Sequence, residues 1–331
     1  MEKPARKLTA VIAACACLAS LSGCISGSGG ENTSETTEKS IRFGYIKESQ
    51  MHSPGVMVTK EKKLLEAAGI SVEWVEYPAG AYEMTDMAGG SLDFACCGCV
   101  PVMSAQAEHG GLAIIAGANQ EGSSLVVNST ITAVSDLHGK KIATPGVGSI
   151  QDLLLGMLAF NNEIKIRNVA VKVSDMPILL KKGEIDGFIA WAPHPERAAF
   201  GESGYEILAI DDTLPGYQCC VIAASENMMG NDFETVEKVM DVYFEAYRWF
   251  LENHDESIKM FSAATGVSED IIRESIKTVS YPDIPYCDIG SMEIMAHSLI
   301  EIDKITSVNQ TDVASFIDEL YRPEFLQRYS G

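Results

Sequence analysis

The chain has 331 residues, of which 46% are hydrophobic, 21% charged and 8% aromatic. This composition excludes a mostly disordered or collagen-like chain, and the length favours two domains or one large one. The 46 acidic and 25 basic side chains give a formal net charge of −21. Because such a chain repels a phosphate backbone, we expect no nucleic-acid partner.

The first residues have the pattern of a signal peptide, with a basic start at residues 1–7 and an apolar run at 8–20. The run ends in Leu-Ser-Gly-Cys24, which resembles the lipobox of exported lipoproteins. The resemblance implies a signal peptide over 1–23, a lipid on Cys24, and anchoring at the outer face of the cytoplasmic membrane. Residues 24–40 are rich in Gly, Ser, Thr and Glu and predict a flexible tether. No later segment has the length and apolarity of a membrane-spanning helix.

Short apolar runs then alternate with helical patterns, which predicts parallel sheets covered by helices on both faces. The predicted strands are 41–46, 71–77, 92–96, 112–118, 124–127, 140–143, 169–173, 185–190, 205–210 and 219–224. The predicted helices are 53–68, 82–88, 100–108, 149–161, 176–182, 193–200, 236–251, 256–264, 268–279, 292–305 and 312–321.

This order predicts two α/β units in series followed by a helical tail. We expect the chain to cross between the units near residues 128–132 and again near 223–225. The first lobe then comprises 41–128, the second lobe 129–223, and 224–331 returns to the first lobe as C-terminal helices. Such an α/β clamshell places a ligand cleft between its lobes.

Several motifs carry a family resemblance: Ile-Arg-Phe-Gly-Tyr at 41–45, Ala-Gly-Gly-Ser-Leu-Asp-Phe at 88–94, Leu-His-Gly-Lys-Lys-Ile-Ala at 137–143, Lys-Gly-Glu-Ile-Asp-Gly at 182–187 and Pro-Gly-Tyr at 215–217. With these motifs, residues 41 to about 265 resemble the substrate-binding proteins of ABC importers. The nearest branch takes up taurine, aliphatic sulfonates, nitrate or bicarbonate and is related to binders of thiamine-pyrimidine precursors.

The resemblance implies a two-lobed periplasmic-binding-protein clamshell, type II-like, that delivers a small oxyanionic solute to the transmembrane subunits of an ABC permease. We expect a monomer that is not an enzyme and holds no cofactor or metal. Three alternatives remain open: a binder of a pyrimidine or other flat heterocycle, an enzyme or metal-binding protein on the same fold, and a receptor that feeds a signalling partner.

A candidate oxyanion site follows Gly146 and Gly148, where Ser149-Ile-Gln-Asp has the form of a capping box at a helix start. Backbone N–H groups and the helix dipole favour an anion there. In the resembling proteins the position of Trp191 walls the cleft. The predicted topology places His52 and His194 in opposite lobes, so we expect them to close on one anion together. The expected ligand-binding residues are Tyr45, His52, Ser53, Cys97, Gly98, Gly122, Ser123, Gly148, Ser149, Ile150, Trp191, His194, Tyr217 and Gln218.

Three cysteines gather at Cys96, Cys97 and Cys99. Adjacent residues of a strand point to opposite faces, so we expect these cysteines to fill small buried positions rather than share a metal ion. The alternative is a thiolate site with His52 or His109 as a further ligand. Disulfides among the cysteines of an exported chain also remain open.

Overall fold

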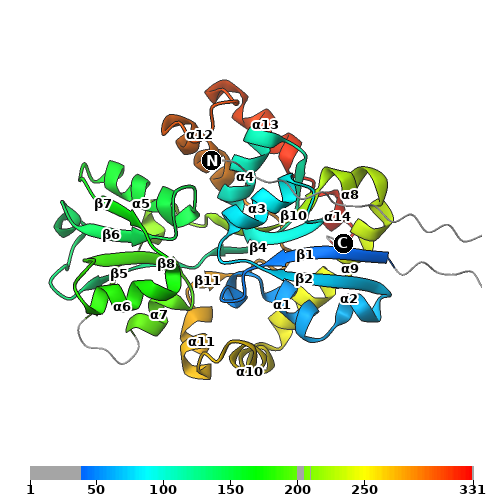
Figure 1. Cartoon of the computed structure of the whole chain (residues 1–331), viewed down its shortest axis with the longest axis horizontal. Helices are drawn as coiled ribbons and strands as arrows, with labels where there is room; N and C mark the ends of the chain where they lie inside the picture. The colour runs from blue at the N-terminus through cyan, green and yellow to red at the C-terminus, as the bar shows by residue number, and fades with distance from the viewer. Residues whose placement is uncertain (1–38, 200–204, 209, 330–331) are drawn as a thin grey trace, which may run out of the picture. The chain divides into compact units, whose positions relative to one another are not determined.

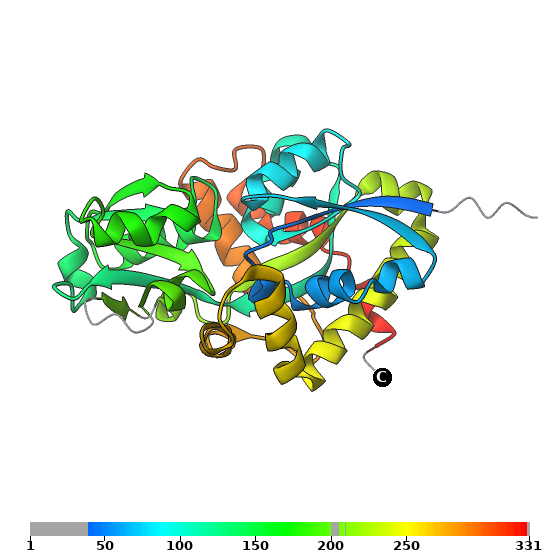
Figure 2. The same ribbon diagram turned by 60° about the horizontal axis from the view of Figure 1, so that its bottom comes forward.

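The computed structural model describes residues 39–199, 205–208 and 210–329. The predicted signal peptide, Cys24 and almost all of the tether lie outside the described residues. The described chain forms two β-sheets within one compact unit, Glu38–Gly331. Figures 1 and 2 show the strands of the second sheet, drawn in green, grouped apart from the first. We call each sheet with its covering helices a lobe.

The first sheet has six strands and the second has five, in the orders β11-β4-β10-β3-β1-β2 and β7-β6-β8-β5-β9. The first sheet comprises β1 (Lys39–Tyr45), β2 (Ile70–Glu76), β3 (Phe94–Gly98), β4 (Leu112–Glu121), β10 (Gln218–Ser225) and β11 (Val279–Ser280). The second comprises β5 (Ser123–Asn128), β6 (Lys141–Thr144), β7 (Arg167–Ala170), β8 (Gly187–Trp191) and β9 (Tyr205–Leu208).

Both sheets are mixed, so the prediction of parallel sheets is wrong in part. Strands β1, β2 and β3 are parallel, but β10 is antiparallel to both β3 and β4. In the second sheet β6 is parallel to β7 and β8, whereas β5 is antiparallel to β8 and β9. The strands that run against the rest of their sheets are β10 and β11 in the first sheet and β5 in the second, and β5 and β10 directly follow the two connections between the sheets.

The crossings between the sheets lie earlier in the sequence than expected. Strand β4 belongs to the first sheet and β5 to the second, with Gly122 alone between them. The chain returns between β9 and β10, before Gln218. The expected crossings near 128–132 and 223–225 therefore fall at the far ends of strands that already belong to the other sheet. Apolar periodicity marks a strand but does not say which sheet it joins.

The predicted helices are present with small shifts at their ends, and the helix expected over 53–68 is split because Lys63 has a φ of +54°. The helices are α1 (Pro54–Glu61), α2 (Leu64–Ala67), α3 (Gly80–Ala88), α4 (Cys99–His109), α5 (Ile150–Asn161), α6 (Met176–Lys181), α7 (His194–Ala199), α8 (Glu226–Asn231), α9 (Phe233–Glu252), α10 (His254–Thr265), α11 (Glu269–Ile276), α12 (Ile289–Glu301), α13 (Val313–Leu320) and α14 (Glu324–Gln327). In the described part of the chain, no helix combines the length and apolarity that a membrane span needs.

The C-terminal helices pack mainly on the first lobe, as expected. Helix α9 lies against α1, and the approach is so close that a Cβ on Gly55 would lie 2.7 Å from the ring of Tyr243. Helices α13 and α14 cover β4. Two helices also reach the second lobe, since α11 contacts α7 and α12 contacts α5. The tail therefore touches both lobes.

Candidate functional site

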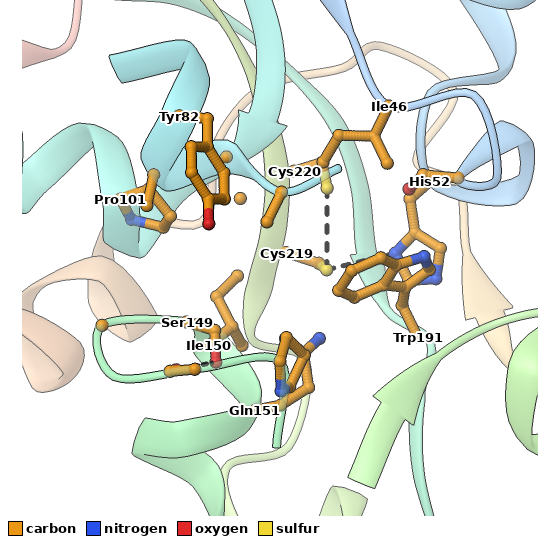
Figure 3. Close-up of a pocket in the computed structure, with 18 of the residues that line it drawn as sticks. Ile46, His52, Tyr82, Pro101, Ser149, Ile150, Gln151, Trp191, Cys219 and Cys220 are labelled. Atoms are coloured by element: carbon orange, nitrogen blue, oxygen red, sulfur yellow. Dashed lines mark hydrogen bonds between the residues drawn. The ribbon is translucent and has the colours of Figure 1, made fainter. Parts of the chain in front are cut away.

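A cavity of about 210 Å³ lies between elements of the two sheets and is the candidate ligand site (Figure 3). The first lobe contributes the loop after β1, the start of α3 with the residue before it, and parts of β3, α4 and the start of β10. The second lobe contributes the loop before α5, the first turn of α5, and Trp191. The lining residues are Ile46, Ser49, His52, Ala79, Gly80, Ala81, Tyr82, Gly98, Pro101, Pro145, Gly146, Val147, Gly148, Ser149, Ile150, Gln151, Trp191, Cys219 and Cys220.

The described lining residues include no lysine, arginine, aspartate or glutamate. Any charge on a ligand therefore meets backbone dipoles, hydroxyl groups, His52 or the two cysteines. A volume of this size suits a small solute rather than a cofactor.

The helix start at α5 has the capping geometry that the sequence predicts, with one difference. Ser149 Oγ accepts the N–H of Asp152 at 3.1 Å and donates to the carbonyl oxygen of Gly146 at 2.8 Å. The Asp152 carboxylate, however, accepts the N–H of Gly148 at 3.1 Å instead of the N–H of Ser149. The Ser149 hydroxyl and the Gly148 N–H are thus already used. The N–H groups of Ile150 and Gln151 remain as the donors that this helix start can offer to an anion.

Six of the expected residues line the cavity: His52, Gly98, Gly148, Ser149, Ile150 and Trp191. Gly98 and Ile150 come from different lobes, and a Cβ on Gly98 would lie 3.2 Å from Ile150 Cδ1. Trp191 ends β8, and its Nε1 donates to the carbonyl oxygen of Glu48 at 3.3 Å. These residues bring the two lobes together around the site.

Seven other expected residues are not among the lining residues, because each packs or bonds in the layer behind them. Tyr45 is buried beside Trp74, Cys97 lies beneath Gly80, and Gly122 lies behind His52. Ser53 donates to the Ser49 carbonyl oxygen. The hydroxyl of Ser123 accepts from Gln151 Nε2, and the backbone N–H of Ser123 donates to the Tyr217 hydroxyl. Gln218 donates to the carbonyl oxygens of Asn119 and Cys220. They support the residues that line the cavity, and their contact with a ligand stays a prediction.

His194 lines a neighbouring hollow together with Glu48 and Trp191, and not the cavity lined by His52. Burial lowers the pKa of His194 to about 4, and the positive charges of Arg197 and His52 add to this effect. A neutral His194 is a poor partner for an anion. The expected closure of the two histidines on one anion is therefore not supported.

Sequence reasoning missed a cluster formed by His52, Cys219, Cys220 and Asn119, all buried. His52 Nδ1 lies 3.2 Å from Cys219 Sγ and 3.1 Å from Asn119 Nδ2, and the two sulfur atoms are 3.9 Å apart. In Figure 3 dashed lines run from the sulfur of Cys219 to the sulfur of Cys220 and toward His52. The available signal was the Cys-Cys pair at the start of a predicted strand, but nothing in its spacing points to His52.

A β-bulge explains why adjacent strand residues bring their sulfur atoms together. Gln218 pairs with Gln120 and Cys220 with Asn119, so β10 advances two residues while β4 advances one. Cys219 is the extra residue, and a bulge of this kind redirects side chains. Asn119 Oδ1 accepts the N–H of Cys220 at 3.1 Å and holds the bulge in place.

The two thiols of this cluster differ in acidity. Burial alone raises the pKa of Cys219, but hydrogen bonds from Cys220, His52 and Asn119 and the charge of His52 together lower it to about 5. The pKa of Cys220 is raised, because its hydrogen bond to Cys219 and its own burial favour the thiol. Of the two thiols that line the cavity, Cys219 is therefore the more acidic.

Cys96, Cys97 and Cys99 are free and buried, as are the other described cysteines. Burial raises the pKa of all three thiols well above the usual range. Cys99 donates to the Gln218 carbonyl oxygen at 3.1 Å. Among the described residues, the group of histidine, cysteine and acidic side chains close enough to share an ion is His52, Cys219 and Cys220.

The chain is similar to known proteins in both sequence and fold. Residues 34–263 match the model of the NMT1-like family. A putative aliphatic sulfonates-binding protein of Bacillus subtilis (strain 168) is 26% identical over 327 residues, covering 94% of this chain and 95% of that one. A protein of the same description from Escherichia coli (strain K12) is 26% identical over 260 residues, covering 76% and 80%.

Among solved structures, the ligand-binding component of an ABC-type import system from Staphylococcus aureus, solved with zinc bound, has a TM-score of 0.73. It is 17% identical and the match covers 88% of this chain and 99% of that one. At this identity the likeness shows the fold, which is the two-lobed α/β fold of periplasmic binding proteins.

Proposed function

The chain belongs to the NMT1-like family, and from this premise we propose that it is the solute receptor of an ABC-type importer. The proposed ligand is a small oxyanion of the sulfonate type, as the names of its relatives suggest. Binding between the lobes favours the closed form, which presents both lobes to the permease. The protein acts by binding and release rather than by catalysis.

The observation that carries this proposal is the position of the α5 N-terminus in the wall of the cavity. Ser149, Ile150 and Gln151 line the cavity, and the N–H groups of the last two precede the first bonds within the helix. The positive end of the helix dipole adds to these donors. Trp191 and Gly98 bring the lobes close, so an anion held at α5 also contacts the first lobe.

A flat, uncharged heterocycle is the second candidate ligand. Two aromatic side chains, Trp191 and Tyr82, line the cavity, and no described lining residue is a lysine or arginine. Stacking on these rings requires no charge on the ligand. The two candidates respond differently to a negative charge introduced at the helix start.

The test is isothermal titration calorimetry with taurine, alkanesulfonates, nitrate, bicarbonate, sulfate and pyrimidines. Ser149→Asp is the informative variant, because aspartate caps a helix as well as serine while adding a carboxylate to the cavity wall. The matched control is Ser268→Asp, since Ser268 Oγ likewise caps α11 by accepting the N–H of Ile271.

We expect one anion to bind the wild type and the control with equal affinity, and Ser149→Asp to weaken it at least about tenfold. Binding of a pyrimidine that survives Ser149→Asp would establish the second candidate. Anion binding that is the same in all three proteins would refute the oxyanion site at α5.

We further propose that the receptor is exported and held at the outer face of the cytoplasmic membrane by a lipid on Cys24. The support is the lipobox-like sequence that ends in this residue. Cys24→Ala should move the protein from the membrane fraction to the medium or the soluble envelope fraction. Retention of this variant in membranes would contradict the lipid anchor.

A further inference from the structure

The floor of the cavity holds three metal-binding side chains that the proposed function does not use. The ligand atoms of His52, Cys219 and Cys220 all lie within 4.8 Å of one another, and all three residues are buried. Each of them also lines the cavity. Imidazole and thiolate together are the ligands that zinc and similar thiophilic ions prefer.

The distances match those around a tetrahedral zinc ion. Zn–S bonds of about 2.3 Å and Zn–N bonds of about 2.0–2.1 Å separate two sulfur ligands by about 3.8 Å and a nitrogen from a sulfur ligand by about 3.6 Å. The sulfur atoms of Cys219 and Cys220 are 3.9 Å apart. His52 Nδ1 is 3.2 Å from Cys219 Sγ. The ligand atoms of His52 and Cys220 lie within 4.8 Å of each other, so an adjustment of the His52 ring completes the geometry.

The surrounding residues hold these side chains in place. Gly122 leaves room for the His52 ring, since a Cβ there would lie 2.7 Å from His52 Cε1. Asn119 lies against His52 Nδ1 and also faces the carbonyl oxygens of Gln120 and Glu121, at 3.3 and 3.1 Å. When an ion binds at His52 Nδ1 in place of the Asn119 amide, the amide can still donate to these two carbonyl oxygens.

We propose that His52, Cys219 and Cys220 bind one zinc ion, with a fourth coordination position that faces the cavity. Three protein ligands with one open position are typical of zinc sites at which an exogenous molecule binds. Binding of the ion displaces the protons that the thiols of Cys219 and Cys220 still carry, and these protons pass to solvent. The open position takes water or an anionic or nitrogen donor of a small solute.

This inference reverses the sequence-based expectation that the protein holds no metal. It also differs from the alternative considered there, because the ligands come from β10 and the loop after β1 rather than from Cys96, Cys97 and Cys99. It is independent of the proposed function, since the ion can be measured without any solute.

The test is titration of the reduced protein with Co²⁺ and then Zn²⁺, with no solute present. We expect one equivalent of Co²⁺ to produce a thiolate charge-transfer band with tetrahedral d–d bands, and Zn²⁺ to displace it. Cys219→Ser and Cys220→Ser should each remove about half of the charge-transfer band and weaken Zn²⁺ at least about a hundredfold. The matched control is Cys287→Ser, another buried cysteine, which should bind as the wild type does.

Circular dichroism of each variant shows whether it folds, and His52→Gln provides an independent change that spares the thiols. Absence of a cobalt band in the folded wild type would overturn the proposal. So would a band that keeps its full intensity in Cys219→Ser and disappears in Cys97→Ser. Anion titrations in the presence of a chelator report separately on the proposed function, so failure of one inference leaves the other measurable.

Discussion

The indole of Trp191 and the backbone of Glu48 join the two lobes across the cavity. Trp191 Nε1, at the end of β8, donates to the Glu48 carbonyl oxygen in the loop after β1, at 3.3 Å. The Glu48 carboxylate lies 3.4 Å from His194 Nε2 at the start of α7. One short loop of the first lobe thus contacts two elements of the second. Contacts of this kind favour the closed form on which the proposed function depends.

Trp191→Phe should keep an aromatic wall and remove the donor to Glu48. A hydrogen bond contributes about 1 kcal/mol, so we expect solute affinity to fall about fivefold through a smaller population of the closed form. Calorimetry measures the affinity. Trp249→Phe is the control, because Trp249 lies on α9 and is not among the cavity-lining residues. Equal losses in both variants would argue against a role for the Trp191–Glu48 bond.

His194 should make the protein less stable in acid. Its pKa in the folded protein, about 4, lies below the usual value of 6.5, because burial disfavours the charged ring. Between these two values the unfolded chain binds more protons than the folded one, so the free energy of unfolding falls as the pH falls through this range. The free energy of unfolding that is lost in this way is on the order of 3 kcal/mol at most, because the nearby Glu48 carboxylate favours the protonated ring.

Urea unfolding of the wild type and His194→Gln at several pH values between about 7 and 4 measures this contribution. We expect the variant to lose less stability than the wild type over that range. If the free energy of unfolding changes with pH equally in the two proteins, His194 has the same pKa in the folded and unfolded chains. That result would contradict the prediction.

Gly122→Ala should lower the free energy of unfolding for two separable reasons. Gly122 has a φ of +90°, and a Cβ there would lie 2.7 Å from His52 Cε1 and 2.8 Å from Val279 Cγ2. Gly216→Ala is a matched control, because Gly216 has a φ of +69° with nothing within 4 Å of the added carbon. We expect both to lose about 1 kcal/mol from backbone strain, and Gly122→Ala to lose about 2 kcal/mol more from the clash.

Thermal or urea unfolding of both variants provides the comparison. Displacement of His52 should also raise the pKa of Cys219, because the imidazole lowers it in the native site. The rate of thiol alkylation against pH reports that change. An equal loss of stability in the two alanine variants would mean that the His52 ring moves aside without cost.

Asp152→Asn should strengthen the binding of an oxyanion and leave a neutral ligand unaffected. The Asp152 carboxylate accepts the N–H of Gly148 behind the α5 start and places a negative charge close to the site. Its removal should raise anion affinity about threefold to tenfold, an effect that salt reduces. Titrations at low and high salt test this expectation. An unchanged affinity for the anion would place its binding site away from α5.

The order of strands and helices could be predicted from the sequence because it depends on local patterns. Apolar periodicity marked the strands, and Gly146, Gly148 and Ser149 marked the start of α5, where the serine cap is confirmed. Trp191 was expected beside the cleft from a family resemblance, and it lines the cavity. These features depend on residues close together in the chain.

The cluster of His52, Cys219 and Cys220 was not predictable in this way. Adjacent cysteines of a regular strand point to opposite faces, and only the bulge between β10 and β4 brings their sulfur atoms together. His52 lies 167 positions from Cys219 in the sequence and reaches it because Gly122 leaves space behind its ring. The sequence by itself determined the family, the elements and the helix start that lines the cavity. Only the tertiary structure decided which of the candidate side chains line the cavity, because strand register and close packing are set by distant parts of the chain.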